Sequence, residues 1–164
     1  MSNIQHKLKE NKSRIRREKF LSASDSKFSD FLSHAEYCSE ISCIKNAAFP
    51  KWDKDINIIT TSRGELRNWN NFKFKTWQEL IAMLKKFHQV KNYIGWFFIE
   101  DDGPFFKISL NAFLSHIQHI SNYGIKNAHY NFVWVGDIDD VGIIIGENPS
   151  QSNGNKFNIS IWGI

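Results

Sequence analysis

Apolar residues recur at helical spacing near the amino terminus of the chain. Residues three and four positions apart share one face of a helix, and the set here is Phe28, Phe31, Leu32, Ala35 and Cys38. Ser24 or Asp25 stands where a helix cap is needed, because a short oxygen side chain accepts a hydrogen bond from a free backbone N–H. Before it, residues 2–20 are expected to be a polar helix or a loose arm. Their apolar stripe is thin and consists of Ile4, Leu8 and Ile15.

Two further helices are predicted in the middle of the chain. In "TWQELIAMLKKFHQV", Thr76 and Glu79 have the spacing of a capping box. The second helix is "SLNAFLSHIQHISNYG", with Ser109 as its cap and Gly124 as the left-handed residue that ends it. Its apolar face is Leu110, Phe113, Leu114, Ile117 and Ile120.

Short apolar runs predict strands, mostly in the second half of the chain. "YIGWFFI" and "FFKIS" are expected to form a hairpin around "EDDGP". Three more candidates are "HYNFVWV", "VGIIIGE" and "KFNISIW", and their short connections favour antiparallel pairing. Earlier, "DINIIT" is a possible strand and "TSRGELRNWNNFKFK" is expected to be a loop. The pattern predicts an α+β fold: N-terminal helices followed by an antiparallel β-sheet interrupted by one helix.

The size and composition of the chain fit a folded domain. It has 164 residues, of which 41% are hydrophobic and 15% aromatic. We expect a basic arm or helix over 1–22 and a single α+β domain over 23–164. No apolar run is long enough to span a bilayer, and no signal-peptide pattern precedes the domain. Cys38 and Cys43 do not suggest a disulfide framework, so a cytoplasmic setting is expected.

The charge is distributed unevenly. Residues 1–92 carry 18 Lys and Arg against 10 Asp and Glu, whereas residues 93–164 carry 3 against 7. Six of the seven late acids form two clusters, Glu100–Asp102 and the "DIDD" of residues 137–140. A sequence pI near 9.0 alone would suggest a nucleic-acid partner. The concentrated negative charge of the second half weakens that inference.

The "DIDD" cluster has several possible roles. Oxygen-rich clusters suit Mg²⁺ or Ca²⁺, but the spacing misses an EF-hand, and no lysine lies between Lys126 and Lys156 to complete a nuclease-type site. Asp favours turns and disfavours strand interiors. We therefore expect Asp137, Asp139 and Asp140 to occupy a turn, with their carboxylates in water and available to a partner. Trp134 and Trp162, which lie near the cluster in sequence, would be candidate anchors for a partner if exposed, but we expect them to be core residues.

Other candidate chemistry is sparse. His116 and His119 share one helix face and, with His129, could form a zinc site, but no HExxH pattern is present. No motif for nucleophilic catalysis, dinucleotide binding or a phosphate-binding loop occurs. We expect no cofactor, no bound metal and no catalytic residues, and hence a binding protein rather than an enzyme. An enzyme whose site is assembled from scattered residues is a third hypothesis.

A nucleic-acid-binding protein that uses the basic N-terminal half is the alternative hypothesis. The segment "KLKENKSRIRREK" could contact phosphates through its cations. The interleaved aromatics of "RNWNNFKFKTW" would suit stacking against unpaired bases. Both segments also have a purely structural explanation. The first would be a solvated helix, and the second would be a loop whose aromatic side chains enter the core.

"NFVWVGDIDDVGIIIGE", followed by the strand "FNISIWG", resembles the small single-domain immunity proteins of bacterial polymorphic and contact-dependent growth inhibition toxin systems. The resemblance covers the C-terminal half and implies an antitoxin that binds a cognate toxin domain and blocks its active site. Many such toxins are nucleases with basic clefts. The acids complementary to that cleft would be the expected partner-binding residues, namely Glu100, Asp101, Asp102, Asp137, Asp139 and Asp140. No membrane partner is expected.

Overall fold

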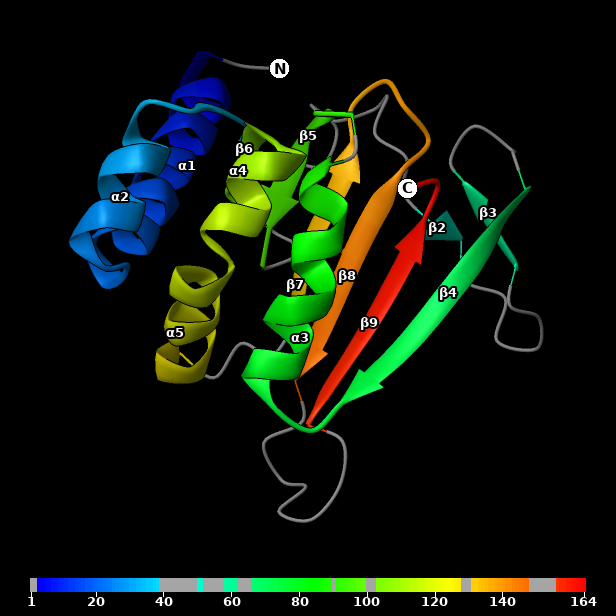
Figure 1. Cartoon of the computed structure of the whole chain (residues 1–164). Helices are drawn as coiled ribbons and strands as arrows, with labels where there is room; N and C mark the ends of the chain where they lie inside the picture. Colours follow the sequence, from blue (N-terminus) through cyan, green and yellow to red (C-terminus); the bar gives the residue numbers. More distant parts are fainter. Residues whose placement is uncertain are drawn as a thin grey trace.

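The computed structural model of the chain describes residues 3–38, 50–51, 58–61, 66–89, 91–99, 103–127, 131–147 and 156–164. Within these ranges, helices and an antiparallel sheet form one α+β fold (Figure 1), which confirms the predicted fold class. The helices are α1 Asn3–Ala23, α2 Ser26–Ser33, α3 Trp77–Leu84, α4 Leu110–Ser115 and α5 Ile117–Asn127, with a 3₁₀ helix η2 at Lys85–Gln89.

The described strands form one sheet in the order β1-β6-β5-β7-β8-β9-β4-β3-β2, and every neighbouring pair is antiparallel. Their bounds are β1 Glu36–Cys38, β2 Pro50–Lys51, β3 Ile58–Thr61, β4 Leu66–Phe74, β5 Ile94–Phe98, β6 Phe105–Ser109, β7 Asn131–Gly136, β8 Gly142–Glu147 and β9 Phe157–Trp162. The predicted hairpin of "YIGWFFI" with "FFKIS" is present as the β5–β6 pair.

The main core lies between one face of the sheet and the helices. Helices α3, α4 and α5 cover this face, and α1 and α2 lie beside α4 and α5 (Figure 1). Alternate strand residues such as Phe97, Phe106 and Trp134 point into this layer, because successive side chains of a strand face opposite ways. Phe20 of α1 and Phe28 of α2 contact the Phe97 ring at centroid distances of 6.5 and 6.0 Å, so both helices dock on the sheet.

A second buried cluster occupies the opposite face of the sheet. It contains Trp96, Trp162 and Phe105 together with Cys38 and Val135. Both Trp134 and Trp162 are therefore core residues, as expected, but they belong to different layers.

Several local predictions about the helices are confirmed. Asp25 caps α2 by accepting a hydrogen bond from Phe28 N–H at 3.1 Å. Thr76 and Glu79 form the complete capping box of α3. The Ser109 hydroxyl caps α4 through Ala112 N–H at 3.1 Å.

Three local predictions are wrong. "TSRGELRNWNNFKFK" contains the nine-residue strand β4, because pairing with β9 overrides the poor strand preference of its asparagines. The predicted helix from Ser109 to Gly124 is broken at His116, and α5 continues past Gly124, which lacks the positive φ of a left-handed terminus. Cys38 lies in β1 rather than on a helix.

Candidate functional site

The acidic segment 137–140 forms the turn between β7 and β8, as the sequence predicted. Gly136 N–H donates to Val141 C=O at 2.8 Å and closes the turn at its base. The four side chains of the turn lie in different environments, and so its three aspartates are not equivalent.

Asp137 is held from two sides. Its Oδ1 accepts a hydrogen bond from the indole Nε1 of Trp96 at 2.8 Å, and its Oδ2 lies 2.9 Å from the ammonium of Lys107. Its backbone N–H donates to the carbonyl of Ile94 at 3.0 Å. Since charge-assisted hydrogen bonds are the strong ones, these three contacts fix the start of the turn to β5 and β6.

Lys107 is the centre of a small polar network on the sheet face opposite the helices. Its ammonium lies 5.4 Å from the centroid of the Trp96 ring and 3.8 Å from Oε2 of Glu36 in β1. The hydrogen bond to Asp137 raises the pKa of Lys107 above its ordinary value, against the opposing effect of desolvation. The nearby charges of Asp137 and Glu36 add to the rise, so Lys107 stays charged.

The remaining turn residues divide between core and solvent. Asp140 is buried, with 7% of its surface exposed. Asp139 is half-buried and faces Lys91 at 3.5 Å, and Ile138 is 75% exposed. The expectation that the three carboxylates lie in water is therefore wrong for Asp140, which is buried, and for Asp137, because the strand neighbours of the turn supply it with a cation and an indole donor.

The chain was compared with protein-family models, with curated proteins and with solved structures. No match was found in any of the three. Within the described residues, none of the helices is both long and apolar enough to span a bilayer.

The second acidic cluster, Glu100, Asp101 and Asp102, lies outside the described residues. The described residue that precedes it, Ile99, follows the end of β5, whereas the Asp137 turn contacts Ile94 at the start of β5. At about 3.3 Å per residue, the two ends of this strand segment are about 16 Å apart.

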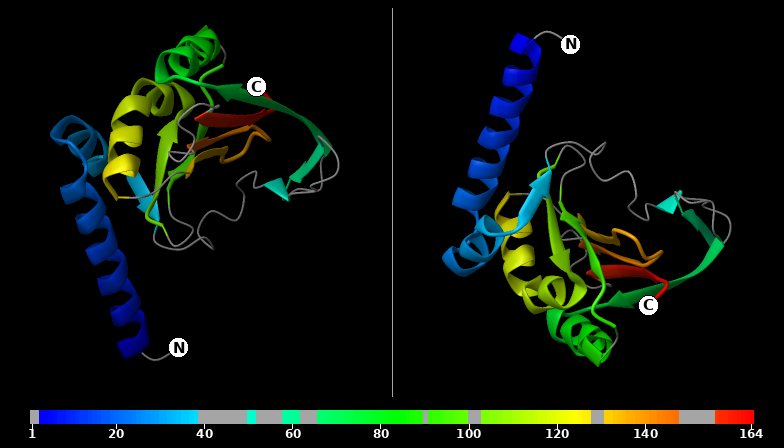
Figure 2. Two further views of the ribbon diagram at one scale, coloured as in Figure 1. Left: turned by 90° about the horizontal axis from the view of Figure 1, so that it is seen from below. Right: turned by 90° about the horizontal axis from the view of Figure 1, so that it is seen from above.

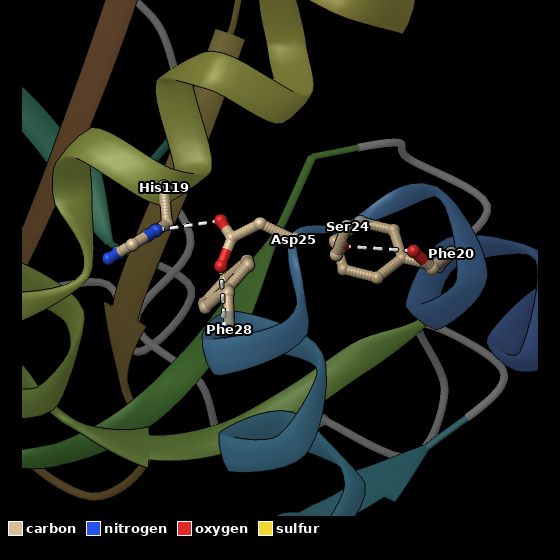
Figure 3. Close-up of polar contacts among 5 residues, drawn as sticks. All are labelled: Phe20, Ser24, Asp25, Phe28 and His119. Atoms are coloured by element: carbon tan, nitrogen blue, oxygen red, sulfur yellow. Dashed lines mark hydrogen bonds and ion pairs between the residues drawn. The ribbon is translucent and has the colours of Figure 1, made fainter.

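His119 of α5 meets Asp25, the residue that caps α2 (Figure 3). Nδ1 of His119 lies 2.7 Å from Oδ2 of Asp25, and since a carboxylate only accepts, the ring nitrogen donates. Partial burial favours the neutral acid, but hydrogen bonds from Phe28 N–H and His119 hold the pKa of Asp25 below its ordinary value. Asp25 thus caps α2 and joins it to α5 at the same time.

His116 lies 5.8 Å from His119 between ring centroids, and His129 is outside the described residues. The His116 ring stacks on Phe31 at 4.4 Å, and burial lowers the pKa of His116 below its ordinary value. In the part of the chain that the structure describes, no group of three or more His, Cys, Asp or Glu residues is arranged to hold a metal ion.

The basic N-terminal segment is the helix α1 rather than a loose arm. In the segment "RNWNNFKFKTW", Phe74 packs against the main core, while Phe72 and Lys73 on β4 are exposed. Residues 67–74 of this segment thus belong to a strand of the sheet, and the Phe72 ring is exposed on it.

Sequence reasoning missed Lys107, Trp96 and Ile138. The search for a lysine near the aspartates covered only the neighbouring sequence, whereas Lys107 and Lys91 reach them through space. One available signal was the position of Lys107 in "FFKIS". A lone cation inside an apolar strand requires a nearby acid, because a buried charge is costly without a partner.

Proposed function

We propose that this protein is an immunity protein that binds the toxin domain of a cognate bacterial toxin, with a nuclease as the expected toxin class, and blocks its active site. The observation that carries the proposal is the β7–β8 turn, which exposes Ile138 beside the half-buried Asp139. An exposed large apolar side chain with a charged neighbour can serve as the anchor of a protein–protein contact.

The geometry of the turn favours binding because its backbone is already ordered. Asp137 is fixed by Lys107 and Trp96, and the backbone bond between Gly136 and Val141 closes the turn. A preorganised loop loses little conformational entropy when a partner binds, and this raises affinity. Ile94, whose carbonyl accepts from Asp137 N–H, is also exposed, at 48%.

The individual acids take different parts in this proposal. Asp139 supplies a surface charge to a basic cleft, Asp137 positions the turn through its contact with Lys107, and Asp140 is buried. Glu100, Asp101 and Asp102 remain proposed partner-binding residues on the strength of the family resemblance. The protein would act in the cytoplasm, where the toxin has its target.

Two equally exposed isoleucines provide a matched test. Ile138→Ser removes the apolar centre of the turn, whereas Ile4→Ser makes the same change on α1, where Ile4 is 72% exposed. The partner is the toxin domain encoded beside the gene or isolated with the protein from its native strain. Loss of a central contact costs more than about 1.4 kcal/mol, or roughly tenfold in affinity. We expect this loss, with reduced protection of toxin-expressing cells, for Ile138→Ser alone.

Full affinity and full protection by the Ile138→Ser protein would place the interface elsewhere. If the Ile4→Ser protein alone lost affinity, the toxin would bind at α1 instead. Asp139→Asn is expected to slow association, and this effect should shrink as salt rises, because surface charges act mainly by steering.

Nucleic-acid binding through α1 is the second candidate function. Residues 4–12 of α1 are all exposed, and the helix carries seven Lys and Arg against two Glu. If it binds nucleic acid, the affinity for a single-stranded oligonucleotide falls steeply with salt, and deletion of residues 1–18 abolishes binding. Binding that is insensitive to salt would contradict this function.

A further inference from the structure

The exposed apolar residues of α1 follow a heptad pattern. These residues are Ile4, Leu8 and Ile15, and with the polar Asn11 between the last two, successive positions are four, three and four residues apart. This is the spacing of the d and a positions of a coiled coil, in which such residues form one seam along the helix. Ile4, Leu8 and Ile15 are 72%, 56% and 58% exposed, and so the seam is uncovered in the described structure.

The seam faces away from the rest of the protein. At about 100° per residue, Phe20 lies roughly 140° around the helix from the middle of the seam. Phe20 is buried against Tyr123 at 4.4 Å between ring centroids, and Arg17 donates to Ser33 C=O at 2.7 Å, so their side of α1 is the docked side. Figure 2 shows the amino-terminal part of α1 projecting clear of the other helices and the sheet.

Cations flank the seam on both sides. In the register set by Leu8 and Ile15 at a, the e and g positions are occupied mostly by basic residues, namely Lys7, Lys12, Arg14 and Lys19. Side chains at e and g contact the partner helix and select its charge. A partner helix with glutamates at these positions is therefore complementary to α1.

We propose that α1 is a docking helix for an acidic amphipathic helix of a partner protein, with which it forms a short two-stranded coiled coil through Ile4, Leu8 and Ile15. The surface is separate from the β7–β8 turn, so this proposal does not rest on the proposed immunity function. Phe20 is buried near the carboxyl end of α1 and fixes the helix to the domain, so the helix is already formed when the partner binds.

The described residues favour this partner over three others. A second copy of α1 would place cations against cations at e and g, which is unfavourable. A membrane surface requires a broad apolar face, whereas the exposed seam offers three apolar side chains in a helix of 21 residues. Nucleic acid would use the cations but would leave the apolar seam between them unexplained.

A synthetic 21-residue peptide provides a direct probe. The probe has Leu at a and d, Asn at the position that faces Asn11, and Glu at e and g. The control peptide has the same composition in an order that breaks the heptad pattern. Fluorescence anisotropy with the full chain is expected to give at least tenfold tighter binding for the heptad peptide. The Leu8→Ser protein should lose this preference, and the Ile138→Ser protein should keep it.

A charge-matched pair of variants separates seam contacts from general electrostatic attraction. Lys12→Glu changes an e position, whereas Lys9→Glu makes the same change in charge at a b position away from the seam. We expect Lys12→Glu to weaken peptide binding at least threefold more than Lys9→Glu does. Both residues are exposed in the described structure, so neither variant should alter the fold.

Each other outcome overturns the proposal. Equal binding of the two peptides, or equal effects of Lys12→Glu and Lys9→Glu, would show that only net charge is recognised. Dimerisation of the free protein that Leu8→Ser abolishes would identify a second copy as the partner. Tight binding of a single-stranded RNA oligonucleotide that Leu8→Ser leaves unchanged, together with no preference for the heptad peptide, would assign α1 to nucleic acid.

Discussion

The ammonium of Lys107 and the carboxylate of Asp137 lie 2.9 Å apart, and this contact ties the middle of β6 to the turn that follows β7. Because β5 lies between these two strands in the sheet, the pair spans the strand that carries Trp96. The same carboxylate accepts the indole N–H of Trp96, which is buried. Asp137 is thus a structural residue as well as a part of the candidate site.

Replacement of Asp137 should destabilise the protein even though it belongs to a turn. Asp137→Ala leaves a buried indole N–H without its acceptor and removes the nearer of the two carboxylates beside the Lys107 ammonium, at a cost of about 2–3 kcal/mol. Asp137→Asn retains an oxygen for Trp96 and should cost about half as much. Urea denaturation of both variants measures the difference.

Asp139→Asn is the matched control for Asp137. Its partner Lys91 is largely exposed, and surface ion pairs contribute about 0–1 kcal/mol. Equal destabilisation by Asp137→Asn and Asp139→Asn would show that the network around Lys107 adds nothing to stability.

His116 should make the stability of the fold depend on pH. Burial and the neighbouring His119 lower the pKa of His116, while Asp25 opposes them. Below pH 6.5, the ordinary pKa of histidine, His116 is protonated more readily in the unfolded chain than in the folded chain. The free energy of unfolding therefore decreases as the pH falls below 6.5. Urea denaturation at pH 7.5 and pH 5.5 measures the decrease.

His116→Phe tests the origin of this effect, because it retains a ring against Phe31 and removes the titrating group. The variant should lose part of the decrease between the two pH values. Asp25 does not interfere, because its pKa is lowered: its contribution to stability is constant above its ordinary value of 3.8 and is lost only as pH falls below that value. An unchanged decrease in the variant would exclude His116 as the cause.

The two ends of α1 should differ in their importance for folding. Phe20→Ala removes a ring packed against Tyr123 and Phe106, and the cavity is expected to cost about 3–5 kcal/mol. Deletion of residues 1–12 removes described residues that are exposed, and the melting temperature should change little. A large fall in melting temperature on deletion would show that the projecting part of α1 packs against the domain.

Gly163→Ala should disturb the acidic turn, because Gly163 lies against the backbone of Asp140. Gly163 has a φ of +67°, a conformation that costs other L-residues about 1–2 kcal/mol. A Cβ at this position would also contact the backbone oxygen of Asp140. Gly146→Ala is the control, since its Cβ would meet the movable side chain of Asn131 at 3.2 Å. Thermal denaturation should show the larger loss at Gly163.

Much of the fold could be predicted because its signals are local. The capping box of Thr76 and Glu79 depends on residues three positions apart, and the strand alternation around Trp134 depends on immediate neighbours. The paired strands β5 and β6 are joined by a short connection, so their antiparallel arrangement could also be predicted from the sequence.

The features that were missed depend on the order of strands in the sheet. Lys107 meets Asp137 only because β5 lies between β6 and β7, and no local pattern specifies that order. The strand β4 was hidden by Asn68, Asn70 and Asn71, which disfavour strands until a neighbouring strand pairs with them. Helix spacing alone did not place the His119 ring beside Asp25, because that contact joins two helices distant in sequence.

The strand order also has a consequence for how the chain folds during synthesis. The pairing of β4 with β9 joins a strand of the first half to one made near residue 160. Until the ribosome has produced Phe157–Trp162, one edge of β4 lacks its partner, and an unpaired strand edge can pair with other chains. The closing of the sheet is therefore a late step, and until then the unpaired edge of β4 is a place where incomplete chains can aggregate.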